Sequence, residues 1–146
     1  MTNADIKVIG KDTVLNKLPK RTQESHKGTY GHVLNIAGST QFTGAAYLSS
    51  IASLRIGAGY CALASCSDVI ETISSYSPDI TYIDLGQSSY GTIPKDGGKY
   101  IQTLSNYEAV SIGCGLNLLG GVKDFIVNFI RKNINSYTPI IIDADG

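Results

Sequence analysis

The stretch 38–46, GSTQFTGAA, is the first segment whose residue types could hold a ligand. It joins an apolar run to an amphipathic one, and Thr43 is expected to be the N-cap of a helix. The backbone N–H groups of Gly44, Ala45 and Ala46 would then lack intrahelical partners and favour a phosphate or another anion. Small side chains there also let a flat ligand approach the backbone. The glycines would equally serve a tight strand-to-helix turn, so both interpretations stay open.

A second glycine-rich segment, GCGLNLLGG at positions 113–121, follows a later apolar run. Gly113 and Gly115 would again let a ligand approach the backbone closely. The third glycine of the segment is Gly120, which comes two positions too late for the GxGxxG dinucleotide fingerprint. The segment alone is therefore a weak Rossmann signal.

No familiar catalytic fingerprint is present. The first glycine segment is not a Walker A loop, because five residues separate Gly38 from Gly44 and Ala45 stands where the lysine would be. The sequence has no GxSxG elbow, no HExxH motif and no Cys/His couple in a recognisable setting. We therefore expect no catalytic residue and no metal-ligand set in this chain.

Basic residues and glycines around the first predicted strand have simple structural explanations. His26 and Lys27 could contact an anionic ligand or form an exposed basic loop, and His32 is expected to be a packed or edge residue of a strand. Gly57 and Gly59 follow a predicted helix, where a helix C-cap is the natural explanation.

Five short apolar runs predict strands, and the stretches between them predict helices. The strands are expected at 32–37, 60–64, 80–85, 109–113 and 139–144, and the helices at 43–56, 68–75, 98–104 and 118–133. This alternation is typical of an α/β fold with a parallel sheet covered by helices on both faces. Both glycine segments follow strands, at the edge where open α/β sheets bind ligands. Asp143 and Asp145 would point to opposite faces if the last strand continues through them.

The composition excludes several classes of partner. The 146 residues carry 12 Lys and Arg against 12 Asp and Glu, so the net charge gives no electrostatic footprint for nucleic acid or an anionic membrane. The start, MTNADIKVIGKD, is not a secretory signal, and no stretch approaches the ~18 apolar residues of a membrane span. We therefore expect a cytoplasmic protein that binds neither nucleic acid nor membrane. Cys61, Cys66 and Cys114 are expected to be reduced, buried thiols.

In order and spacing, the motifs resemble the ADP/ATP-dependent NAD(P)H-hydrate dehydratases, the carbohydrate-kinase-like family also known as the YjeF C-terminal domain. The family typically reads HKGxYG, then a strand ending in AGS, then TGAA and an RxGAG helix end. The same motifs stand here at 26–31, 37–39, 43–46 and 55–59. The later segments SIGCGLN and PIIIDADG are similar to the family's IGPGLG and DADGLN. The resemblance covers residues 21–146 and implies a ribokinase-like fold.

Two residues depart from the family's pattern in the second glycine segment. Cys114 replaces the usual proline, and Asn117 replaces the usual final glycine. Both changes are expected to loosen the loop, while Gly113 and Gly115 remain.

The resemblance also implies a reaction. Members of the family repair hydrated NADH or NADPH by removing water from the nicotinamide ring, and they use a phosphate of ADP or ATP, with Mg²⁺, to activate the hydroxyl as a leaving group. The resemblance implies that the NAD(P)H hydrate lies over the two glycine segments. Its expected contacts are Ala46 and Gly115 first, and Ala45 and Gly113 next.

Other family motifs are expected to follow position 146. They are the HPGE segment, the nucleotide-binding loops and the GTGD motif, whose aspartate acts as the catalytic base. Residues 1–146 are therefore interpreted as the N-terminal portion of a single, apparently truncated dehydratase domain with no assignable nucleotide-binding residue. The chain alone is expected to be inactive, and to form a homo-oligomer or to associate with the missing half.

Two alternative functions remain open from the sequence. The same fold could support ATP-dependent phosphorylation of a small alcohol. Assays of phosphoryl transfer and of nucleotide-dependent dehydration would distinguish the two functions. The glycines could also only shape turns in a non-catalytic Rossmann-like binding module, in which case no dinucleotide would appear near Ala46 or Gly115.

Overall fold

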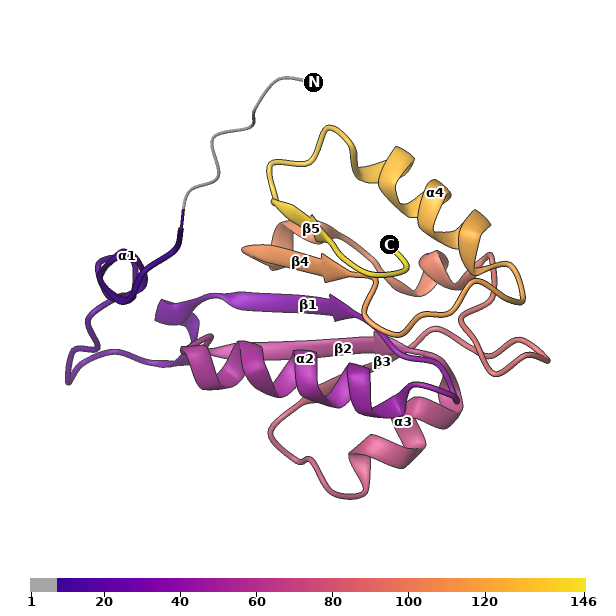
Figure 1. Cartoon of the computed structure of the whole chain (residues 1–146), viewed down its shortest axis with the longest axis horizontal. Coiled ribbons are helices and arrows are strands. Elements are labelled where there is room, and N and C mark those ends of the chain that lie inside the picture. The colour runs from indigo at the N-terminus through magenta and orange to yellow at the C-terminus, as the bar shows by residue number, and fades with distance from the viewer. Residues whose placement is uncertain (1–7) are drawn as a thin grey trace.

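A computed structural model describes residues 8–146, which form a five-stranded parallel sheet flanked by helices (Figure 1). The strands are β1 (His32–Ile36), β2 (Tyr60–Ser65), β3 (Thr81–Asp84), β4 (Ala109–Ile112) and β5 (Ile140–Ile142). The helices are α1 (Lys11–Leu15), α2 (Thr43–Ile56), α3 (Ser67–Ser74) and α4 (Val122–Asn133), with 3-10 turns η1 (Lys27–Tyr30), η2 (Gly97–Tyr100) and η3 (Leu104–Asn106). Among these residues, no helix has both the length and the apolar character needed to cross a membrane.

The strand order β3-β2-β1-β4-β5 places β1 at the centre of the sheet, and every neighbouring pair is parallel. From β1 the chain adds β2 and β3 on one side, and it then crosses to add β4 and β5 on the other. Because crossovers between parallel strands are right-handed, α2 and α3 cover one face of the sheet and α4 the other. The predicted α/β class, with helices on both faces, is confirmed.

Asn35 fastens α2 to the middle of the sheet. This residue of β1 is buried, and its Nδ2 donates to the hydroxyls of Ser49 (2.8 Å) and Ser50 (2.9 Å) on α2. Its neighbours Leu34 and Ile36 point to the opposite face, because side chains alternate along a strand. These hydrogen bonds set the position of α2 along β1, and therefore the position of the helix N-terminus.

The core is built from aliphatic and aromatic side chains of the sheet, of α3 and α4, and of the connecting loops. Burial of each such side chain contributes roughly 1.5–3 kcal/mol. The largest fully buried members are Leu34, Ile36, Leu63, Val69, Ile73, Leu85, Ile93, Val110, Ile112, Leu116, Val122 and Phe125. The α4 members come from one side of the helix, which is the amphipathic pattern that predicted it.

The helix predicted over 98–104 is wrong. This segment forms the separate 3-10 turns η2 and η3. Gly97 and Gly98 are poor helix formers, and Gly97 is buried where η2 packs against the core. The segment buries Ile101 and Leu104 from irregular backbone, so tertiary packing and the glycine pair override the helical spacing of its apolar residues.

Other predicted boundaries shift by a few residues. The last helix begins at Val122 instead of position 118, because Gly120 (φ 65°) and Gly121 (φ 91°) adopt a left-handed backbone that a helix cannot include. The last strand ends at Ile142, two residues earlier than predicted, where the chain turns. These differences leave the order and the type of the other elements unchanged.

We predict that Phe125→Ala lowers the free energy of unfolding by about 3–5 kcal/mol, because it opens a cavity beneath α4. Phe125 is fully buried and stacks on Phe129, with ring centroids 6.1 Å apart. Chemical denaturation checks this, with Val127→Ala on the exposed side of the same helix as the matched control. The control should cost under about 1 kcal/mol. Equal losses for the two variants would contradict the burial of this face.

Candidate functional site

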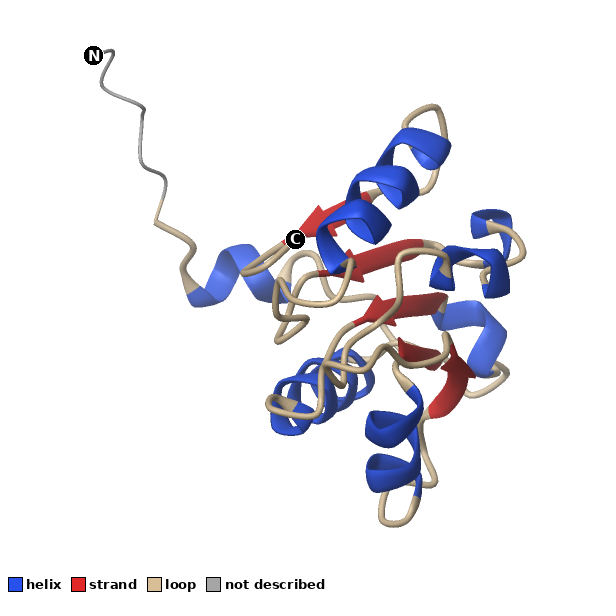
Figure 2. Ribbon diagram, turned by 90° about the vertical axis from the view of Figure 1, so that its right-hand side faces the viewer, coloured by secondary structure: helices blue, strands red, loops and turns tan. Residues whose placement is uncertain are grey.

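The turn after β1 meets the loop after β4 at the carboxyl ends of the strands. Figure 2 looks at the molecule from this side, with the connecting loops in front of the sheet. The Gly38 N–H donates to the Cys114 carbonyl (2.9 Å), and the Ser39 hydroxyl donates to the Gly115 carbonyl (2.9 Å). These bonds join the two loops beyond the ends of the paired strands. The two glycine segments singled out in the sequence therefore form one continuous surface.

The N-terminus of α2 lies at this junction. The prediction that Thr43 is the N-cap of this helix is wrong. Phe42 occupies the N-cap position, because its N–H donates to the Ser39 carbonyl (2.9 Å) in a tight turn, and no side chain caps the helix. The amide of Ala45 donates to the Phe42 carbonyl (3.1 Å), so this N–H is not free, contrary to the prediction. Gly44 is exposed, with open space where a side chain would stand.

The structure brings the four predicted contact residues together. A Cβ atom on Gly115 would lie 2.7 Å from the Ala45 Cβ, and one on Gly38 would lie 2.7 Å from the Ala46 Cβ. Both distances are far shorter than a normal contact, so only glycine permits this approach. Ala45 and Gly115 are half-buried and reach the surface, whereas Ala46 and Gly113 are buried beneath them.

The segment after β5 packs onto the same loop. The Asp143 N–H donates to the Ile112 carbonyl (3.0 Å), and the Asp143 carbonyl lies directly against Gly113, where any side chain would collide with it. The chain then turns, so Asp143 and Asp145 do not alternate across a continuing strand, which was the condition for their pointing to opposite faces. Asp145 instead accepts a hydrogen bond from the Asn117 amide (3.0 Å).

Asn117 is a site residue whose role the sequence did not reveal. It has a positive φ of 64°, a conformation that glycine adopts freely and asparagine tolerates better than most other residues. Its Nδ2 donates to Gln41 Oε1 (3.0 Å), and its Oδ1 accepts from the Leu118 amide (2.6 Å). Asn117, which replaces the family's glycine, therefore connects the loop after β4 to the turn after β1. The prediction that this substitution loosens the loop is wrong.

The three cysteines are free thiols. Cys61 and Cys66 are buried as predicted, and burial raises the pKa of the Cys61 thiol to about 11. Cys114 is only half-buried, because it lies on the loop that borders the site. Partial burial and the charge of Asp143, whose Oδ2 lies 3.7 Å from the sulfur, raise the pKa of the Cys114 thiol.

The motifs around the first strand have structural roles. His26 caps η1 by accepting from the Gly28 amide (3.2 Å), and His32 packs edge to face on the Tyr60 ring (5.2 Å), as expected of a packed residue. Gly57 ends α2 with a φ of 123°, which confirms the predicted C-cap. Gly59 has a different role, since the Lys27 carbonyl occupies the place of a side chain there.

A cleft of about 400 Å³ opens beside the loops, between α4 and residues 144–146, with Leu118, Ile126 and Lys123 on its wall. Apart from Lys123 and Asp145, the side chains that line it are apolar. The loops themselves, at 37–46, 113–121 and 143–146, carry no Lys or Arg that would neutralise the phosphates of a nucleotide.

Metal ligation has no support within the described part of the chain. No group of three or more His, Cys, Asp or Glu side chains in residues 8–146 is placed to hold an ion. The carboxylate of Asp145 is engaged by the Asn117 amide.

Comparison with known proteins identifies the family. A sequence model described as NAD(P)H-hydrate dehydratase matches residues 33–146, which includes every loop of the site. The chain belongs to the NAD(P)H-hydrate dehydratase family. The resemblance of its motifs is thereby confirmed.

Individual relatives agree with this assignment. An ATP-dependent (S)-NAD(P)H-hydrate dehydratase of Entamoeba histolytica is 32% identical over 129 residues, covering 88% of this chain and 41% of that protein. An ADP-dependent (S)-NAD(P)H-hydrate dehydratase of Listeria monocytogenes is 33% identical and covers 88% of this chain and 43% of that protein. The chain thus spans less than half the length of the curated relatives that it matches.

Solved structures confirm the ribokinase-like fold. The ADP/ATP-dependent NAD(P)H-hydrate dehydratase of Bacillus subtilis, co-crystallised with ATP/Mg²⁺, superposes with a TM-score of 0.69 at 32% identity, covering 92% of this chain and 44% of that one. A ribokinase-like superfamily protein of Enterococcus faecalis has a TM-score of 0.75 at 19% identity, covering 93% and 44%, and shows the fold alone.

We predict that Gly115→Ala lowers the free energy of unfolding by roughly 2 kcal/mol, because the new methyl group meets Ala45 and the backbone has a φ of 66°. Thermal or chemical denaturation measures the loss. The matched control is Gly44→Ala, where the space is open and the helix favours alanine by up to about 1 kcal/mol. A neutral Gly115→Ala would mean that the two loops do not touch.

We also predict that alkylation of Cys114 by iodoacetamide reaches half its maximal rate at a higher pH than for an unperturbed thiol, because the thiolate is the reactive form. Asp143→Asn should shift this midpoint to lower pH, since it removes the negative charge that raises the pKa. Mass spectrometry of the folded chain follows the reaction, with Asp124→Asn on α4 as the control. An unchanged midpoint in Asp143→Asn would contradict the proximity of the two groups.

Proposed function

We propose that this chain supplies the substrate-binding part of an ADP- or ATP-dependent (S)-NAD(P)H-hydrate dehydratase, an enzyme of metabolite repair that returns hydrated NADH or NADPH to its native form. The observation that carries the proposal is the junction between the α2 N-terminus and the loop after β4. It lies wholly within the residues that match the family model. The reaction is the one that its Entamoeba and Listeria relatives are named for.

In this proposal the nicotinamide end of the hydrate lies over Ala45 and Gly115, with Ala46 and Gly113 forming the base of the surface. Small residues there let the planar part of the ligand contact the backbone. The uncapped first turn of α2, with Gly44 in open space, offers backbone N–H groups and the positive end of the helix dipole to a phosphate of the dinucleotide. The contribution of these residues is to bind and orient the substrate.

In this proposal, the residue that acts as the catalytic base and the residues that bind ADP or ATP belong to the rest of the domain. The chain spans about 41% of the length of its Entamoeba relative. Residues 1–146 are proposed as the N-terminal portion of one ribokinase-like domain. When bound, the Mg²⁺ complex of ADP or ATP supplies the phosphate that activates the substrate hydroxyl as a leaving group. The loops described above offer no cation for those phosphates. We therefore propose that these residues alone do not complete the reaction.

The proposal includes a compartment and an assembly. Cys61, Cys66 and Cys114 are all free thiols, which suits the reducing cytoplasm. The free edge of β5 exposes Ile141 and Ile142 (60% and 53%), and an exposed apolar edge strand favours association. A homo-oligomer, or association with the remainder of the domain, would cover such surfaces.

We predict that titration of the chain with hydrated NADH shifts the backbone amide NMR resonances of Gly44, Ala45 and Gly115. Gly115→Ala should weaken binding by roughly tenfold, because the added methyl group meets Ala45 and displaces the loop that contacts the substrate. A tenfold loss of affinity equals about 1.4 kcal/mol. Ile134→Ala, at the exposed C-terminal end of α4 and away from the cleft, is the control and should bind like the parent chain. Shifts that avoid both loops, or affinity unchanged by Gly115→Ala, would contradict the proposed site.

A conversion assay separates the rival reactions. With hydrated NADH, Mg²⁺ and either ADP or ATP, the 146-residue chain alone should form no NADH. The same chain joined to the remainder of a dehydratase domain should form it. Transfer of phosphate from ATP to a small alcohol, without dehydration, would favour a ribokinase-like kinase instead.

A further inference from the structure

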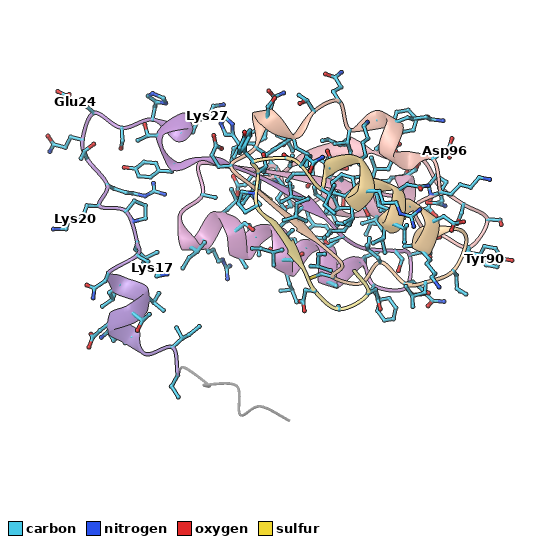
Figure 3. All side chains as sticks on the ribbon, turned by 90° about the horizontal axis from the view of Figure 1, so that it is seen from above. Lys17, Lys20, Glu24, Lys27, Tyr90 and Asp96 are labelled. Carbon is cyan, nitrogen blue, oxygen red and sulfur yellow. The ribbon has the colours of Figure 1, made fainter. Side chains whose placement is uncertain are left out.

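A groove of about 470 Å³ lies between α4 and η2. It follows one side of α4, because Phe125, Phe129 and Lys132 recur at the three- and four-residue spacing of a helix face. Figure 3 looks onto α4 and shows the labelled Asp96, which directly precedes η2, beside this helix. The groove shares no residue with the two glycine segments or with the cleft beside residues 144–146, so it is separate from the candidate site.

The wall of the groove is mostly apolar. Phe125 and Phe129 stack on each other, with ring centroids 6.1 Å apart, and form its floor. Gly97 is buried against the core, and the next residue, Gly98, faces the groove, where a Cβ atom would lie 3.7 Å from the Phe125 ring. This is an ordinary contact distance, so a side chain at position 98 would occupy the groove without a collision. Glycine at this position keeps the groove open.

Lysines line the rim of this groove. Lys95 lies next to the start of α4, where a Cβ atom on Gly121 would be 3.2 Å from the lysine Cβ, and Lys132 lies in the last turn of the same helix. Lys99 pairs with Asp96 (2.7 Å). Within the part of the chain that the structure describes, no carboxylate forms an ion pair with Lys95 or Lys132. The rim therefore carries two cations without an ionic partner among these residues.

The size and the chemistry of the groove fit a small ligand. Small-molecule sites usually measure about 300–1,000 Å³ and are largely apolar with a few polar groups, whereas a stable protein interface needs roughly 800 Å² from each partner. An aromatic ring suits a floor of phenylalanines, because aromatic pairs gain energy beyond the burial of apolar area. A phosphate monoester carries about −1.5 to −2 charges at pH 7, which two unpaired lysines match.

We propose that the groove between α4 and η2 binds a small aromatic molecule that carries a phosphate monoester. The ring of this ligand lies along Phe125 and Phe129, and the lysines of the rim bind the phosphate. Because the groove shares no residue with the junction of the two glycine segments, the inference goes beyond the proposed dehydratase function and is tested without its substrate.

The probe for this site is 1-naphthyl phosphate, titrated into the 146-residue chain and followed by the backbone amide NMR resonances. We expect shifts at Gly98, Lys99, Asn128 and Phe129, and an affinity that falls as salt is raised, because part of the binding is electrostatic. Inorganic phosphate, which lacks the ring, and 1-naphthol, which lacks the charge, should each bind at least roughly tenfold more weakly. Shifts only at other residues, no binding of the probe at millimolar concentration, or equal binding of either control compound would overturn the proposal.

Variants separate the contributions of charge and shape. Lys95→Gln/Lys132→Gln should weaken binding of the probe by roughly five- to tenfold. Lys17→Gln/Lys20→Gln removes the same charge from the segment before β1, far from α4 in Figure 3, and should leave binding unchanged. Gly98→Leu should abolish binding, because its side chain fills the groove while every lysine remains.

Two results with these variants would contradict the site. One is a dissociation constant for the probe that the Lys95→Gln/Lys132→Gln variant or a folded Gly98→Leu variant leaves unchanged. The other is a shift of the same amides with protein concentration in the absence of the probe, which would show a second copy of the chain in the groove.

Discussion

The site depends on the close approach of two backbones at the centre of the sheet. Gly38 and Gly115 allow the turn after β1 and the loop after β4 to come within contact of the first turn of α2, where any side chain on either glycine would collide with Ala46 or Ala45. The hydrogen bond from the Gly38 amide to Cys114 then locks the two loops together. Without this approach, the helix N-terminus and the loop would be separate surfaces.

The rest of the fold positions the N-terminus of α2 and the loops after β1 and β4. The strand order reverses between β1 and β4, so the helices that follow their loops, α2 and α4, cover opposite faces of the sheet while the loops themselves meet. Asn35 fastens α2 to β1 from below, and Asn117 ties the loop after β4 to the segments on both of its sides. The surface at the two glycine segments consists of small residues, with the carboxylates of Asp143 and Asp145 on the segment beside it. In the proposed function this surface receives the planar ring, and the phosphate chemistry uses groups from the rest of the domain.

Much of this arrangement could be predicted from the sequence, and the reasons for the failures are physical. The apolar runs predict the strands, and the resemblance predicts that Ala45 and Gly115 share one surface. The helix predicted over 98–104 does not form because Gly97 and Gly98 have low helix propensity, which outweighs the helical spacing of the apolar residues in this segment. The N-cap at Phe42 could not be predicted, because it is set by a turn from Ser39 and not by a capping side chain.

The roles of Asn117 and Asp145 depend on contacts between segments 28 residues apart, which no local pattern reveals. The only sequence signal was asparagine at a position where the family has glycine, since these two residues best accept a positive φ.

The most direct measurement is a crystal structure of the protein soaked with hydrated NADH. If the junction of the two loops binds the substrate, electron density for the nicotinamide ring will lie against Ala45 and Gly115, with Gly38 and Gly113 unmoved beneath it. Density for the dinucleotide at another surface, or none at these loops under saturating ligand, would contradict the account.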